Sequence, residues 1–73
     1  MKVKSNGFYV IQMKDVYGKD VKTIAEVTLL NDQQQRLYVK PVNHPAEITN
    51  QDGVISKFGD KQSVKFLKRI NVG

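Results

Sequence analysis

The 73-residue chain carries a net charge of +5, contains no cysteine, and has the size of one small domain spanning residues 1–73. Without cysteine it forms neither a disulfide nor a thiolate zinc site, and the lone His44 cannot build a histidine metal cluster. No apolar run approaches the roughly 20 residues of a membrane-spanning helix, and no signal-peptide pattern follows the basic N-terminus. We therefore expect a cytoplasmic protein with no membrane association.

The small size limits how much stability a hydrophobic core supplies. A domain of this length buries only about 60–65% of the surface that its unfolded chain exposes. Small domains usually compensate with disulfides, a structural metal or self-association. Since the composition offers neither disulfides nor a thiolate metal site, we expect either a tight core or a homo-oligomer.

Two β-strands joined by a turn are predicted at the start of the chain. The segment 8–13, FYVIQM, is aromatic and β-branched, and the segment 21–30, VKTIAEVTLL, is rich in valine, threonine and isoleucine. Gly18 marks a turn between them. The two segments are therefore predicted to form a hairpin.

The first of these strands has two apolar faces, which leaves its orientation open. If Phe8 and Val10 face the core, Tyr9 and Ile11 form an exposed apolar patch of the kind that binds another protein. In the alternative, Tyr9, Ile11 and Met13 are the core set, and Phe8 and Val10 lie outside. A strand with two apolar faces is typical of a central or covered position in a sheet.

A third strand is predicted at 36–42, RLYVKPV, where Pro41 indicates a strand end or a sheet edge. Alternation places Arg36, Tyr38 and Lys40 on one face of this strand. Such a face suits single-stranded nucleic acid, because a base stacks on the aromatic ring while the cations hold phosphates. The same pattern is also typical of any sheet with one solvated face.

The remaining residues predict further short strands. Strands are expected at about 46–50 and 54–58, joined by Asp52 and Gly53, a pair that favours a type I′ hairpin turn. The segment 60–71 is ambiguous. Its β-branched and aromatic residues favour a strand, whereas an aspartate N-cap and an apolar stripe would suit a helix.

Five or six short strands at roughly ten-residue spacing predict an all-β or β-rich domain. The expected architecture is a small SH3-like or OB-like barrel or a bent antiparallel sheet. The alternative is an α+β domain with a C-terminal helix at about 60–71.

Catalysis is not expected. His44 lies beside a turn proline without a nucleophile motif nearby, and the aspartates occupy turns, where they usually serve local hydrogen bonding. The glycines are too dispersed for a phosphate-binding loop. We expect no catalytic residue, no cofactor and no metal.

The basic surplus of 12 Lys and Arg over 7 Asp and Glu favours an anionic partner. Much of it lies between Lys57 and Arg69, and lysine predominates, so phosphate attraction should outweigh base recognition. The leading hypothesis is a non-enzymatic domain that binds nucleic acid through backbone charge. The residues expected to carry this binding are Arg36, Tyr38, Lys40, Lys65, Lys68 and Arg69.

The rival hypothesis is a protein-interaction or assembly subunit. Small basic β domains without cysteine are common among auxiliary proteins of phages and mobile elements. In this interpretation Tyr9 and Ile11 contact the partner, and the lysines serve only solubility.

Overall fold

The computed structural model describes the backbone of residues 2–57 and 60–71, and their side chains except those of residues 56, 57 and 60–62. All the regular secondary structure within these ranges is β-strand. The described residues therefore contain no helix that could cross a membrane. The strands are β1 (Gly7–Lys14), β2 (Asp20–Leu29), β3 (Leu37–Pro41), β4 (Glu47–Thr49), β5 (Val54–Lys57), β6 (Asp60–Ser63) and β7 (Lys65–Ile70).

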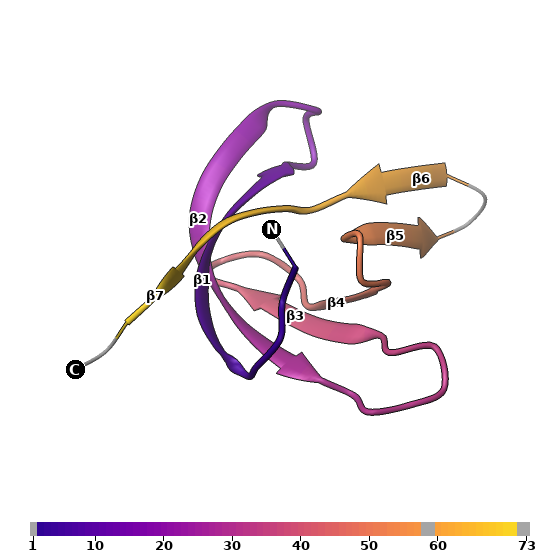
Figure 1. Cartoon of the computed structure of the whole chain (residues 1–73). Coiled ribbons are helices and arrows are strands. Elements are labelled where there is room, and N and C mark those ends of the chain that lie inside the picture. The colour runs from indigo at the N-terminus through magenta and orange to yellow at the C-terminus, as the bar shows by residue number, and fades with distance from the viewer. Residues whose placement is uncertain (1, 58–59, 72–73) are drawn as a thin grey trace.

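Five of the strands form one antiparallel sheet in the order β4-β3-β2-β1-β7, and β5 pairs only with β6 (Figure 1). The sheet is strongly bent but does not close into a barrel. The predicted all-β class with a bent antiparallel sheet is therefore confirmed. The alternative of a helix at 60–71 is wrong, because β6 and β7 occupy that segment.

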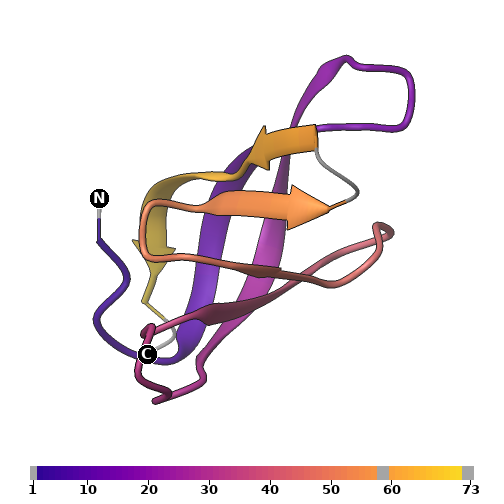
Figure 2. The ribbon, with the colours of Figure 1, turned by 90° about the vertical axis from the view of Figure 1, so that its right-hand side faces the viewer.

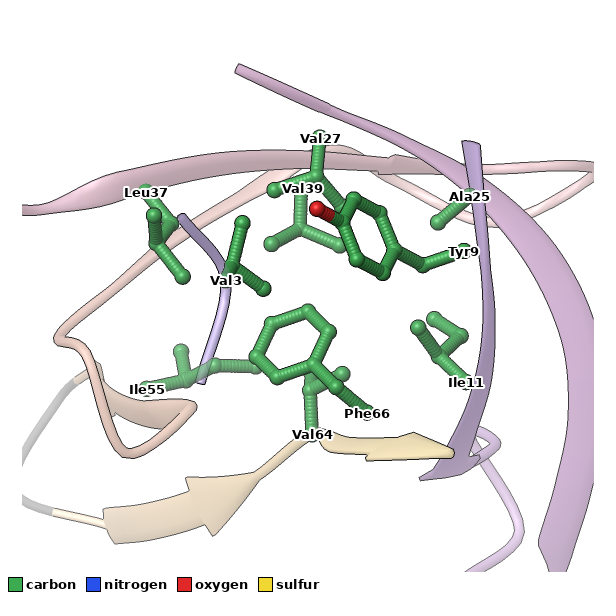
Figure 3. Close-up of a cluster of buried hydrophobic side chains, with 10 residues drawn as sticks. All are labelled: Val3, Tyr9, Ile11, Ala25, Val27, Leu37, Val39, Ile55, Val64 and Phe66. Carbon is green, nitrogen blue, oxygen red and sulfur yellow. The ribbon is translucent and has the colours of Figure 1, made fainter. Parts of the chain in front are cut away.

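The β5–β6 hairpin lies across one face of the sheet and covers the core (Figure 2). Apolar side chains from the sheet and from this hairpin converge in the space between them (Figure 3). The cluster consists of Val3, Tyr9, Ile11, Ala25, Val27, Leu37, Val39, Ile55, Val64 and Phe66. We call the sheet face that lines this core the inner face and the opposite one the outer face.

Tyr9 and Ile11 are 1% and 0% exposed, so the interpretation that they form a protein-binding patch is wrong. Tyrosine is accommodated in the core because its hydroxyl donates to the Ser5 carbonyl at 2.7 Å. Its ring packs edge-on against Phe66, with centroids 6.2 Å apart. The alternative orientation of the first strand is the observed one.

The first hairpin forms as predicted, with β1 and β2 in continuous register from Gly7–Val27 to Lys14–Asp20. Asp15 organises its turn by accepting the backbone N–H of Tyr17 at 2.8 Å and that of Lys19 at 2.9 Å. Gly18 adopts a φ of +79°, which explains the choice of glycine at this position.

The strands predicted at about 46–50 and 54–58 form as β4 and β5, and the Asn50 N–H donates to the Val54 carbonyl at 3.2 Å across the turn between them, but the two strands do not pair as the predicted hairpin. β4 and β5 are not neighbours in a sheet, and Asp52 is absent from the described non-glycine residues with positive φ, so the turn is not type I′. Asn50 instead accepts the N–H groups of Asp52 and Val54 on its side-chain oxygen, each at 2.9 Å. The chain changes direction at this turn, so that β5 lies over the core (Figure 2).

Candidate nucleic-acid interface

The burial of Tyr9 and Ile11 determines which residues of β1 lie on the outer face. Because side chains alternate along a strand, Phe8 and Val10 of β1 lie on the outer face. Phe8 is 43% exposed, a large fraction for a phenylalanine in a central strand. The outer face thus presents an exposed aromatic ring on an interior strand of the sheet.

Cross-strand pairing fixes which side chains surround this ring. One row across the outer face runs from Lys40 through Glu26 and Phe8 to Ile70. These residues come from β3, β2, β1 and β7, in that order. The pairing therefore unites the third predicted strand with the C-terminal segment on one surface.

Three lysines lie on the same face on either side of β1, one in β2 and two in β7. Lys22 and Lys65 both pair with Gln12, from its two sides, and Lys68 pairs with Val10 in the next row. Strand spacing puts the Cα atoms of Lys22 and Lys65 about 10 Å apart. All three lysines are exposed.

A β-bulge in β7 is what places Lys65 and Lys68 on one face. Phe66 pairs with Ile11 and Lys68 pairs with Val10, which leaves Leu67 as an extra residue in β7. Without this extra residue, Phe66 and Lys68 would share a face, as uninterrupted alternation requires. The bulge allows the phenylalanine to enter the core while the lysine stays outside.

Tyr38 supplies a second aromatic side chain on the outer face, where it is 39% exposed. It pairs with Thr28 of β2 and Ile48 of β4. Sheet geometry separates the Cα atoms of Tyr38 and Phe8 by about 12 Å, two strands across and two residues along. The two rings can therefore contact different groups of one extended ligand.

Acidic side chains offset only part of this positive charge. Glu26 lies directly opposite Lys40, and Asp20 is bound to Lys14 at 3.1 Å. Lys22, Lys65 and Lys68 make no ion pair with any described residue. In the described part of the chain no group of acidic or histidine side chains is arranged to hold a metal ion.

Arg36 does not contribute a free charge to the interface. Its Nε donates to Asp32 Oδ2 at 2.6 Å, and its backbone N–H donates to Asp32 Oδ1 at 3.0 Å. The backbone and side-chain hydrogen bonds from Arg36 lower the pKa of Asp32 below its ordinary value. The arginine is thus partly neutralised within its own loop.

Arg69 lies on the inner side of the sheet, because it pairs with Tyr9. Its side chain occupies the space beside Gly7, and its Nη2 donates to the Asn6 carbonyl over 3.4 Å. Alternation therefore directs Arg69 to the opposite side of the edge strand β7 from Lys68 and Ile70.

The predicted nucleic-acid residues thus divide into two groups. Tyr38, Lys40, Lys65 and Lys68 share the outer face, whereas Arg36 is paired and Arg69 faces the other way. The side chains of Lys57 and Lys61, which belong to the predicted basic segment, lie outside the described ones.

Sequence reasoning missed Phe8 and Lys22 as parts of this surface. The available signal was the alternative orientation of the first strand, which puts Phe8 and Gln12 outside. The register of the first hairpin then puts Lys22 opposite Gln12.

The outer face combines exposed aromatic and aliphatic groups with lysines. Comparisons of the chain with protein-family models, curated proteins and solved structures found no significant match.

Proposed function

We propose that the outer face binds single-stranded nucleic acid, mainly through its phosphates, with bases stacking on Phe8 and Tyr38. The observation that supports this most is the position of four lysines on the same face as both rings. Stacking platforms of this kind combine a cationic surface with aromatic side chains on which successive bases rest.

A single strand suits this face better than a duplex. The flat sides of its bases are open to stacking, whereas those in a duplex are already stacked on each other. Lysine binds phosphate as a hydrated point charge and lacks the planar fork that reads guanine edges. Binding at the outer face is therefore expected to depend weakly on base sequence.

The salt dependence of binding tests this proposal. Fluorescence anisotropy of a labelled oligothymidylate, titrated at several salt concentrations, should give a slope of log K against log salt of about −2 to −3, since three or four phosphates contribute about 0.7 each. A duplex of the same length should bind more weakly. No binding at about 50 mM salt would overturn the proposal.

A matched pair of double variants locates the binding surface. Lys65→Gln with Lys68→Gln removes two outer-face lysines, whereas Lys2→Gln with Lys19→Gln removes two exposed lysines elsewhere. Both changes lower the net charge equally. The first should flatten the salt slope by about 1.4, and the second should leave it nearly unchanged. Equal effects would mean that binding is unspecific attraction to the whole molecule.

A second candidate function is supported by the aliphatic part of the same face. Val10 and Ile24 pair directly, and Phe8 and Ile70 pair in the adjoining row, which gives a continuous apolar patch surrounded by charges. An apolar centre with a charged rim is typical of protein interfaces. The lysines would repel a second copy, so this interpretation favours an acidic protein.

Oligonucleotide binding distinguishes the two candidates, and sedimentation tests whether the patch instead binds a second copy of the chain. An acidic protein partner predicts no measurable oligonucleotide binding by the isolated chain. Self-association through the patch predicts a sedimentation mass that rises with concentration, and more steeply at high salt, because salt screens the lysines.

A further inference from the structure

A pocket of about 280 Å³ lies at the end of the β2–β3 hairpin, away from the turn at Gly18. It is bordered by the N-terminal segment, the loop after β2 and the turn after β4. Its lining residues are Val3, Lys4, Leu29, Asn31, Gln35 and Gln51. We propose that this pocket takes one unpaired nucleobase, most favourably adenine, from the strand bound on the outer face; the inference rests on the proposed function.

The walls of the pocket are fixed by hydrogen bonds between distant segments. Gln51 Nε2 donates to the Gln35 carbonyl at 2.9 Å and ties the turn after β4 to the β2–β3 loop. Asn6 Oδ1 accepts the Leu29 backbone N–H at 2.7 Å and ties the N-terminal segment to the end of β2. Val3 is 2% exposed and anchors that segment in the core. The pocket is therefore formed before any ligand binds.

Two lining residues have an unusual backbone conformation. Asn31 and Gln35 have φ values of +55° and +53°, in the left-handed region. Asparagine tolerates this region, whereas glutamine is uncommon there. Non-glycine residues held in such conformations concentrate at binding and active sites. Both residues line the pocket.

The chemistry of the lining matches the edge and the faces of a base. The side-chain amides of Asn31 and Gln35 make no hydrogen bond with any described residue, so their donors and acceptors are available. Asparagine and glutamine amides bind the adenine N6 and N7 positions with two hydrogen bonds. Leu29, which is only partly buried, offers apolar contact to the ring, and Lys4 provides an ammonium group for a phosphate.

The pocket lies on the inner side of the sheet, where Leu29 pairs with Leu37, at the end of the β2–β3 hairpin that the proposed strand approaches from the outer face. Gln35 is three residues from Tyr38, which corresponds to about 10 Å along an extended chain. Leu29 directly follows Thr28, the cross-strand partner of Tyr38 on the outer face. A strand stacked on Tyr38 can therefore pass the end of the hairpin and place a neighbouring base in the pocket.

NMR titration with mononucleotides tests the pocket independently of the outer face. Adenosine monophosphate should shift the side-chain amide signals of Asn31, Gln35 and Gln51, and uridine monophosphate should shift them less. Gln35→Met keeps the length of the side chain and the backbone carbonyl that accepts from Gln51, but removes a base-reading amide. It should weaken adenosine monophosphate binding about tenfold, the loss of roughly one base-reading contact. Gln34→Met, in the same loop but outside this pocket, should have no such effect.

Oligonucleotides distinguish failure of the pocket from failure of the outer face. Oligoadenylate should bind more tightly than oligothymidylate, and Gln35→Met should remove this preference while keeping the salt slope. If both oligonucleotides bind equally and adenosine monophosphate shifts no pocket signal, the pocket inference is overturned and the outer-face proposal stands. If the mononucleotide shifts the pocket signals but no oligonucleotide binds, the pocket is supported as a nucleotide site and the outer-face proposal fails.

Discussion

Replacing Gly53 by alanine should destabilise the protein far more than the same change at Gly18. Both glycines have a positive φ, +81° and +79°, so alanine pays a similar backbone cost at both sites. A Cβ atom at Gly53 would lie 2.0 Å from the carbonyl oxygen of Val64, whereas one at Gly18 would have no atom within 4 Å. The difference between the two variants therefore isolates the collision with Val64.

The left-handed conformation costs an alanine about 1–2 kcal/mol, which is the whole effect expected at Gly18. At Gly53 the neighbouring carbonyl belongs to the backbone, and the Val64 N–H already donates to the Gly53 carbonyl at 2.7 Å. Relieving the collision displaces this junction between β6 and β7, which adds about 1–3 kcal/mol of strain and about 1 kcal/mol of lost hydrogen bonding. The expected total at Gly53 is about 3–6 kcal/mol.

This loss is large for so small a protein, since stabilities of about 0.05–0.15 kcal/mol per residue are typical. Urea unfolding followed by circular dichroism should show a modest shift of the midpoint for Gly18→Ala. Gly53→Ala should unfold at much lower urea or be unfolded from the start. Equal midpoint shifts for the two variants would refute the claim that the close approach of Gly53 to the Val64 carbonyl leaves no room for a Cβ atom.

Further predictions concern the core and the β2–β3 loop. Tyr9→Phe should cost about 1 kcal/mol, the hydrogen bond to Ser5, whereas Tyr9→Ala should cost about 3–5 kcal/mol in urea unfolding, because it empties the centre of the core. Asp32→Asn should release Arg36 and tighten oligothymidylate binding a few-fold in anisotropy titrations, more than Asp52→Asn, which changes the net charge equally. Because the pKa of Asp32 is lowered by folding, its contribution to stability is present at neutral pH and is lost as the pH falls through its folded-state pKa. Asp32→Asn should therefore lessen the acid sensitivity of the urea midpoint, and an unchanged midpoint–pH curve would contradict this account.

Much of the fold could be predicted because the strands carry local signals. Alternation and β-branched residues locate the first three strands, and Gly18 locates the first turn. The orientation of the first strand could not be settled in this way, because both of its faces are apolar. The pairing with β2 puts Tyr9 on the same face as the buried Ala25, and the hydrogen bond to the Ser5 carbonyl satisfies the tyrosine hydroxyl there.

The candidate site was harder to predict, because long-range pairing and an irregularity create it. The pairing of β7 with β1 joins segments from opposite ends of the chain, and no local pattern reveals it. Regular alternation in the C-terminal segment predicts Phe66, Lys68 and Ile70 on one face of the strand. The bulge at Leu67 instead puts Phe66 on the inner face and leaves Lys68 and Ile70 on the outer face. The pairing of Arg36 with Asp32, four residues earlier, was the one local signal that sequence reasoning overlooked.

Photochemical crosslinking tests the central proposal most directly, because it reports which residues touch a base. The probe is a single-stranded oligonucleotide carrying 5-bromouracil, irradiated with the protein and followed by mass spectrometry of the crosslinked peptides. Tyr17 is a stringent internal control, since at 85% exposure it is more accessible than either outer-face ring. Crosslinks at Phe8 and Tyr38, with little at Tyr17, are the predicted result. Crosslinks confined to Tyr17, or spread according to exposure alone, would contradict binding at the outer face.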